Sequence, residues 1–152
     1  MTPAVEAAKR AGIAFDLHEY EGVEVGEGDY AVAVAEALGL PPARLFKTLV
    51  ASVDGQLAVF VVPADRQLDL RAAGKRVVLA DRTAAERATG YVVGGISPLG
   101  QRKRLPMTVD ESMLAWETIL VSAGRRGLQI ELAPADLVAL TGATFAAIAK
   151  LA

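Results

Sequence analysis

The stretch FKTLVASVDGQLAVFVV, residues 46–62, decides the fold. Two runs rich in apolar and β-branched residues flank Asp54-Gly55, a dipeptide that favours the two-residue turn of a β-hairpin because both of its residues tolerate a positive φ. The pattern predicts one strand over residues 46–53 and a second over residues 57–62, which Pro63 ends. An antiparallel hairpin is therefore the first element of the predicted domain.

Helices and strands are mixed irregularly on both sides of this hairpin. Periodicity and end signals predict helices over residues 3–11, 30–38, 68–74, 81–89, 134–140 and 146–151, and further strands over residues 15–20, 77–80, 107–109, 118–121 and 128–132. Thr2, Asp29 and either Asp81 or Thr83 are the expected N-caps, and residues 21–28 are expected to form a loop. Irregular mixing predicts a single α+β domain that spans residues 1–152 and contains a mixed sheet. It argues against a doubly wound parallel sheet.

Length and composition exclude several classes of protein. The 152 residues allow one domain that buries roughly two thirds of its unfolded surface. No apolar run approaches the roughly 20 residues that span a bilayer, and the first residues lack the features of a secretory signal. The chain has no cysteine, which excludes disulfides, thiolate metal sites and a cysteine nucleophile. We expect a cytoplasmic protein without a membrane partner.

The charge pattern limits how the chain could bind nucleic acid. A net charge of −2 is too low for general binding to phosphates, so any RNA contact must be local. Basic residues are clustered in Arg102-Lys103-Arg104 and Arg125-Arg126, which makes a local contact possible. Such clusters also occur in solvated turns that keep an acidic protein soluble, and the sequence leaves both interpretations open.

The usual catalytic patterns are missing from the sequence. His18 is the only histidine, and a lone strand histidine is more often a surface or packing residue than a base or a metal ligand. No Gly-x-Ser-x-Gly elbow or Walker-type phosphate loop is present. What remains is Lys47, entering an apolar strand, and the glycine-proline loop 94–100, whose N–H groups could stabilise an oxyanion. These parts suit acyl transfer, although a solvated lysine and an ordinary turn would look the same.

Five segments together resemble the YbaK family of Cys-tRNA(Pro) deacylases. They are Met1-Thr2-Pro3-Ala4-Val5, Phe46-Lys47-Thr48-Leu49, Gln67-Leu68-Asp69-Leu70, the block TGYVVGGISPLGQ at residues 89–101, and VSAGRRGL at residues 121–128. The resemblance runs nearly end to end, with the motifs in order. It implies a relative of the editing domain of bacterial prolyl-tRNA synthetase, with a mixed, partly barrel-like sheet surrounded by helices.

The resemblance also implies roles for particular residues. The lysine matching Lys47 holds the aminoacylated RNA end, and the loop containing Gly94 surrounds the scissile ester. The other expected substrate-binding residues are Tyr20, Tyr30, Thr48, Gly95, Ile96, Ser97, Pro98 and Ser122. The family is thought to let the substrate's own thiol attack its ester and release a thiolactone, which requires no metal or cofactor and gains from a large effective molarity. The implied partners are the acceptor end of tRNA(Pro) and prolyl-tRNA synthetase.

Two departures from the family pattern bear on specificity. Gln129 stands where an aspartate often follows the Gly-Leu of the last glycine loop, and a neutral amide cannot act as a base. If Gln129 faces the site, thiol activation should be slower or differently tuned; if it faces away, the change is harmless. Asp29 and Tyr30 replace the asparagine and phenylalanine of some relatives. Three alternatives therefore remain. They are a non-catalytic tRNA- or synthetase-binding module, a deacylase for another amino acid such as alanine, and a small-molecule esterase.

Overall fold

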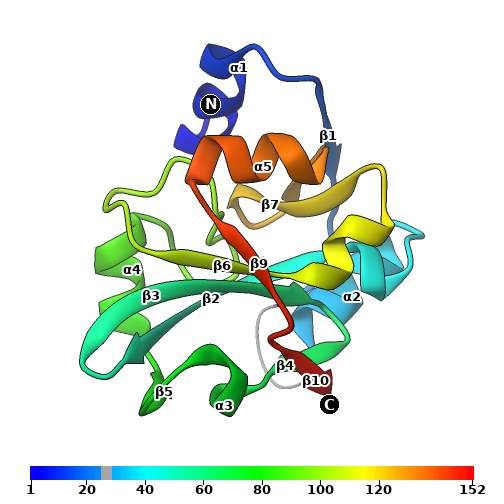
Figure 1. Cartoon of the computed structure of the whole chain (residues 1–152). Helices are drawn as coiled ribbons and strands as arrows, with labels where there is room; N and C mark the ends of the chain where they lie inside the picture. The colour runs from blue at the N-terminus through cyan, green and yellow to red at the C-terminus, as the bar shows by residue number, and fades with distance from the viewer. Residues whose placement is uncertain (25–28) are drawn as a thin grey trace.

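The computed structural model describes residues 1–24 and 29–152, and these form an α+β domain (Figure 1). Its helices are α1 Pro3–Ala11, α2 Tyr30–Ala37, α3 Leu70–Ala73, α4 Arg82–Thr89 and α5 Pro134–Thr141, with 3-10 turns η1 Pro42–Arg44 and η2 Glu111–Ala115. Its strands are β1 Phe15–Glu19, β2 Phe46–Val53, β3 Gln56–Pro63, β4 Arg66–Leu68, β5 Val77–Leu79, β6 Met107–Asp110, β7 Ile119–Arg125, β8 Leu128–Leu132, β9 Thr144–Ala146 and β10 Ala149–Leu151. The predicted fold class is confirmed. No helix within the described residues is long and apolar enough to cross a membrane.

The hairpin of β2 and β3 forms as the sequence predicts. Asp54 and Gly55 have φ values of 50° and 86°, as a two-residue turn with positive φ at both positions requires. Val59 and Val61 point into the main core, whereas Phe60 and Val62 point into a second cluster on the opposite face of the hairpin. Because both faces of β3 are buried, its sequence is apolar nearly throughout.

The strands form three open sheets. The five-stranded sheet has the order β5-β2-β3-β6-β9 and is mixed, since β6 runs parallel to both β3 and β9. The antiparallel sheet β1-β8-β7 approaches it through a bridge between Leu45 and Leu120, and β10 pairs with β4. In Figure 1, α5 and β7 lie on one side of the β2–β3 hairpin, and α3 and β5 on the other. The main core fills the space between the two larger sheets and is closed by α1 and α5.

Most of the expected helix ends are correct. Thr2 caps α1 by accepting a hydrogen bond from the Val5 N–H at 3.2 Å, and its hydroxyl also donates to the Ala123 carbonyl on β7. Asp81 caps α4 through the Ala84 N–H at 2.8 Å. Asp29 occupies the N-cap position of α2, as predicted, but its side chain makes no capping hydrogen bond within the described residues.

Two segments near the second cluster differ from the prediction. Residues 146–151 were expected to be helical but form the end of β9 and strand β10, because the Asp110 carboxylate binds the Ile148 and Ala149 N–H groups and β10 pairs with β4. The predicted helix over 68–74 shrinks to α3, because Leu68 belongs to β4 and Asp69 caps the short helix that follows. In the predicted loop 21–28, residues 21–24 form no helix or strand, and residues 25–28 lie outside the described part.

Candidate active site

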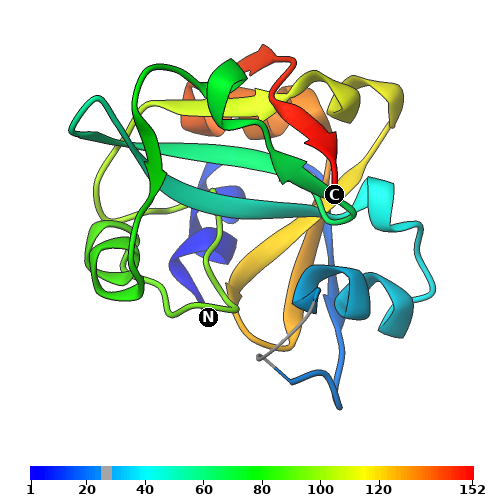
Figure 2. The ribbon, with the colours of Figure 1, turned by 90° about the horizontal axis from the view of Figure 1, so that it is seen from below.

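A cavity of about 440 Å³ lies beside the first half of β2. Figure 2 shows α4 and α2 on either side of the β7–β8 hairpin, below β2, and all of these elements contribute to the cavity wall. Its lining residues are Asp29, Tyr30, Ala31, Val34, Leu45, Phe46, Lys47, Thr48, Leu49, Val50, Ala64, Leu79, Ala80, Arg82, Ala85, Val93, Gly94, Ile96, Ser122 and Gln129. The wall is therefore mostly apolar, with a small number of polar groups, as ligand sites usually are.

Among the residues that the structure describes, Lys47 is the only lysine in this wall. Its Nζ donates to the Ala64 carbonyl at 3.4 Å, which holds the side chain against the end of β3. Burial lowers the pKa of Lys47 from the ordinary 10.5, whereas the carboxylates of Asp29 and Asp65 oppose that shift. A partly desolvated cation at this position is suited to hold an anionic or carbonyl oxygen.

Residues 91–100 form a loop whose two ends are joined by a hydrogen bond. The Tyr91 hydroxyl donates to the Leu99 carbonyl at 2.6 Å, and burial raises the pKa of Tyr91 to about 12, so this hydroxyl stays protonated. Gly94 and Ile96 line the cavity, and Gly94 has a φ of 92°, a conformation that favours glycine. The loop therefore presents backbone, rather than a long side chain, to the cavity at position 94.

Three of the residues expected in the site lie behind this surface. Gly95, Ser97 and Pro98 are buried and are not part of the cavity wall. A Cβ at Gly95 would come within 2.8 Å of the Arg125 Cα, and the Ser97 Oγ accepts from the Leu99 N–H at 3.2 Å. Their position indicates that they shape the loop rather than contact a ligand.

Two tyrosines meet at the α2 side of the cavity. Tyr30 lines the cavity, and its hydroxyl lies 3.0 Å from that of Tyr20, which is not part of the wall. Burial and the hydrogen bond with Tyr20 raise the pKa of Tyr30, so its hydroxyl is neutral. Tyr30 can therefore donate or accept a hydrogen bond but cannot act as an anionic nucleophile at neutral pH.

Two buried polar atoms in the cavity wall have no partner within the described residues. They are Thr48 Oγ1 and Gln129 Oε1, and Gln129 is only 4% exposed. The sequence left open whether Gln129 faces the site, and the structure puts it in the wall, opposite Ser122 in the β7–β8 register. Because unpaired buried polar groups are rare and costly, these atoms are candidates for ligand hydrogen bonds.

The comparisons with known proteins agree with this architecture. The family model of the aminoacyl-tRNA editing domain matches residues 26–140. A protein of Enterococcus faecalis, EbsC, described as a candidate Cys-tRNA(Pro)/Cys-tRNA(Cys) deacylase, is 39% identical over 137 residues, covering 86% of this chain and 83% of its own. The chain belongs to the aminoacyl-tRNA editing family.

Solved structures show the same fold as this editing domain. The hypothetical protein APE2540 is 26% identical, with a TM-score of 0.86 over 97% of this chain and 99% of its own. A candidate trans-editing enzyme for prolyl-tRNA synthetase is 24% identical, with a TM-score of 0.82 over 99% of both chains, and supports the fold alone.

His18 lies outside the cavity wall of the editing domain. Its Nε2 is 2.7 Å from Glu131 Oε1, and Glu131 also binds Arg44 at 2.7 Å and accepts from the Thr118 hydroxyl at 2.6 Å. This network joins β1, β8 and η1 and is structural. Among the described residues, no group of three or more acidic or histidine side chains could hold a metal ion.

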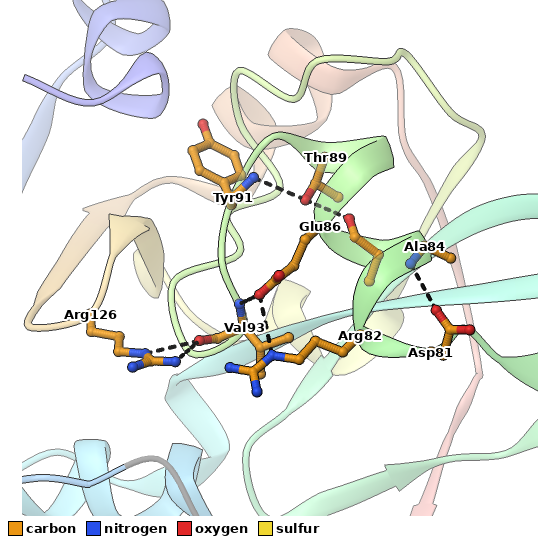
Figure 3. Close-up of polar contacts among 9 residues, drawn as sticks. Asp81, Arg82, Ala84, Glu86, Thr89, Tyr91, Val93 and Arg126 are labelled. Carbon is orange, nitrogen blue, oxygen red and sulfur yellow. Dashed lines mark hydrogen bonds and ion pairs between the residues drawn. The ribbon is translucent and has the colours of Figure 1, made fainter.

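The sequence did not identify several residues around the editing site. Val34, Phe46 and Ala85 supply apolar wall, and Arg82 also lines the cavity. Glu86 and Arg126 bind the backbone of Val93 next to Gly94 (Figure 3). No local pattern marks these contacts, because Arg126 and Val93 are 33 residues apart and meet only in the folded chain.

Proposed function

We propose that this editing domain acts in trans and removes cysteine wrongly attached to tRNA(Pro). The observation that carries the proposal is that Lys47 and the Gly94 backbone line one cavity whose wall, in the described residues, contains no histidine. The chain also has no cysteine. A site with a cation and backbone donors, but without an obvious enzymic nucleophile, suits a substrate that supplies its own.

The proposed reaction is an intramolecular acyl transfer. The cysteinyl Sγ attacks the carbonyl carbon of its own ester, and the bond from that carbon to the terminal ribose oxygen breaks. The thiol proton finally resides on the departing ribose hydroxyl, so the products are a cyclic thiolactone and uncharged tRNA. The protein needs only to position the ester and stabilise the oxyanion, which are the roles proposed for Lys47 and the Gly94 N–H.

Gln129 would influence which amino acid is removed. Its amide oxygen can accept a hydrogen bond from the substrate's ammonium or thiol group without adding a charge. It cannot take up a proton as an aspartate could, so thiol activation would depend on the solvent and on the fraction of thiolate. An alanyl ester has no thiol and would require a bound water instead.

The test is the release of labelled amino acid from cysteinyl-, alanyl- and prolyl-tRNA(Pro). Native protein, Lys47→Ala and Lys9→Ala are compared, because Lys9 is an exposed lysine on α1, outside the cavity wall. We expect rapid loss of cysteine alone, at least 100-fold slower for Lys47→Ala and unchanged for Lys9→Ala. Preferred release of alanine would reassign the substrate, and tRNA binding without release would make the protein a binding module.

The proposed partners are the acceptor end of tRNA(Pro) and prolyl-tRNA synthetase, in the cytoplasm. The low net charge of −2 supports a domain that binds RNA weakly alone and gains affinity from the synthetase. Co-sedimentation with synthetase and tRNA should give a three-component species at micromolar concentrations. Its absence, with deacylation intact, would contradict the synthetase partnership only.

A further inference from the structure

Both peptide groups that flank the Val93 Cα are held by charged side chains (Figure 3). The Val93 N–H donates to Glu86 Oε2 on α4 at 2.7 Å. The Val93 carbonyl accepts from Arg126 Nε at 2.9 Å and from its second terminal nitrogen at 2.8 Å. Charge-assisted hydrogen bonds of this kind are shorter and stronger than neutral ones. The backbone on each side of Val93 is therefore fixed from a different element.

The turn that carries Arg126 is itself packed against the loop. A Cβ at Gly95 would lie 2.8 Å from the Arg125 Cα and 2.9 Å from the Arg126 nitrogen, so the two backbones are in close contact. Glu86 lies 3.5 Å from Arg82 Nε, one turn earlier in α4. The contacts to Val93 thus link α4, loop 91–100 and the β7–β8 turn.

The orientation of the Val93 carbonyl determines where the next N–H points. The Val93–Gly94 peptide is trans, so the Gly94 N–H points away from the carbonyl that Arg126 binds. Gly94 lines the cavity, whereas Arg126 does not. Within residues 1–24 and 29–152, no protein acceptor binds the Gly94 N–H. No described protein acceptor therefore competes with a cavity ligand for this donor.

We propose that Arg126 is a positioning residue that orients the Gly94 N–H toward the substrate carbonyl. This inference rests on the proposed function, in which that N–H stabilises the oxyanion. The guanidinium fixes the peptide plane with two donors to one oxygen, and its charge polarises the peptide, which makes the N–H a better donor. Glu86 supports the same segment by fixing the preceding peptide.

A purely structural role accounts poorly for this arrangement. Arg126 is an exposed residue, and water can solvate an exposed carbonyl, so the hydrogen bonds add little to stability. What two rigid donors on one carbonyl provide is a fixed direction. Arg125, its neighbour at the end of β7, binds only the Arg126 carbonyl among the described residues, at 3.3 Å, and offers a control that removes the same charge.

The kinetic test compares native protein with Arg126→Ala, Arg126→Lys and Arg125→Ala. Single-turnover release of cysteine from tRNA(Pro) is measured at saturating protein, so that losses of RNA affinity do not enter the rate. We expect a fall of about 10-fold for Arg126→Ala, smaller than the roughly 100-fold or greater loss on removing an oxyanion donor itself. Arg126→Lys should be intermediate, Arg125→Ala should stay within about twofold of native, and methylguanidinium should partly restore Arg126→Ala.

A second measurement does not depend on activity. The backbone order parameter of the Gly94 amide, measured by NMR, should be about 0.85 in native protein and Arg125→Ala, and fall below about 0.6 in Arg126→Ala. Equal saturating rates for the two alanine variants, or an unchanged Gly94 amide, would overturn the inference. If native protein releases no amino acid, the proposed function fails, and the Gly94 amide alone then decides whether Arg126 orients this peptide.

Discussion

Gln129 and Glu131 lie two positions apart on β8, and their side chains share one face of the strand. Glu131 contacts His18, Arg44 and Thr118 and is satisfied within the protein. Gln129 is more deeply buried, yet its Oε1 has no partner in the described part of the chain. One strand therefore holds a stabilising polar network and, one pleat away, a buried polar atom without a partner among the described residues.

The largest expected effect is a loss of deacylation on substitution of Lys47 in the cavity wall. Lys47→Met should slow deacylation at least 100-fold, because it removes the cation from the site. It should not lower the melting temperature, because burial disfavours the charged form of Lys47. In native protein, Lys47 loses its proton at a lower pH than it does in the unfolded chain, where its pKa is 10.5. Any gain in stability on replacing Lys47 by Met should therefore be present at neutral pH, decrease as the pH rises through the lowered pKa, and vanish above pH 10.5.

Calorimetry and the cysteine-release assay check this prediction together, with Lys9→Met as the exposed control. A lower melting temperature for Lys47→Met would mean that Lys47 stabilises the fold, as Glu131 does, and is not held in the cavity wall at a cost in stability.

On the network side, Glu131→Ala should lower the free energy of unfolding by about 2 kcal/mol. The substitution leaves the partly buried guanidinium of Arg44 without its carboxylate, and hydrogen bonds to charged groups contribute about 1.5–3 kcal/mol. Urea unfolding measures the loss, and Glu117→Ala, an exposed carboxylate one residue before Thr118, is the control. Cysteine release by the folded variant should remain near native, and a large loss would show that the two sides are coupled.

The same network predicts a pH dependence of stability. The hydrogen bond from Thr118, together with the hydrogen bond from His18 and the positive charge of Arg44, lowers the pKa of Glu131 below its ordinary 4.5, against the opposing effect of burial. The contribution is therefore fully present above pH 4.5 and is lost as the pH falls through the lowered pKa. The difference in unfolding free energy between native protein and Glu131→Gln should shrink in acid, and a constant difference from pH 7 to pH 3 would argue against this origin.

The smallest expected effect is a change in stability on substitution of Thr48, whose Oγ1 is the other buried atom without a partner among the described residues. Thr48→Val removes a buried hydroxyl without changing the shape of the side chain, so the free energy of unfolding should rise by about 1 kcal/mol. Chemical denaturation measures this gain, and Thr108→Val on β6 is a comparison at another partly buried strand threonine. A loss of stability would indicate that Thr48 is hydrogen-bonded in solution, for example to an ordered water.

Local patterns account for the elements that form from neighbouring residues. The Asp54-Gly55 turn and the Thr2 and Asp81 caps each depend on a few adjacent positions, and their prediction is confirmed. Residues 146–151 were assigned to the wrong element because their structure depends on Asp110 and β4, both distant in the sequence.

The candidate site likewise contains residues that a local motif marks and residues that meet only in the folded chain. Lys47 and Gly94 belong to recognisable motifs and lie in the cavity wall, although their roles stay predictions. The orientation of Gln129 and the contact between Arg126 and Val93 depend on strand register and on the packing of the β7–β8 turn against loop 91–100, which the sequence does not encode locally.

The carboxylate of Asp110 has a consequence for synthesis of the chain. It is 6% exposed and accepts from the Ser112, Ile148 and Ala149 N–H groups. Without residues 148 and 149, the Ser112 N–H is the one donor among the described residues that still binds this carboxylate, and burying the carboxylate in that state would cost free energy. The end of β6 therefore becomes stable only after residues 148 and 149 have been synthesised and have folded onto it, so this part of the five-stranded sheet must wait for a segment that lies 38 residues further along the chain.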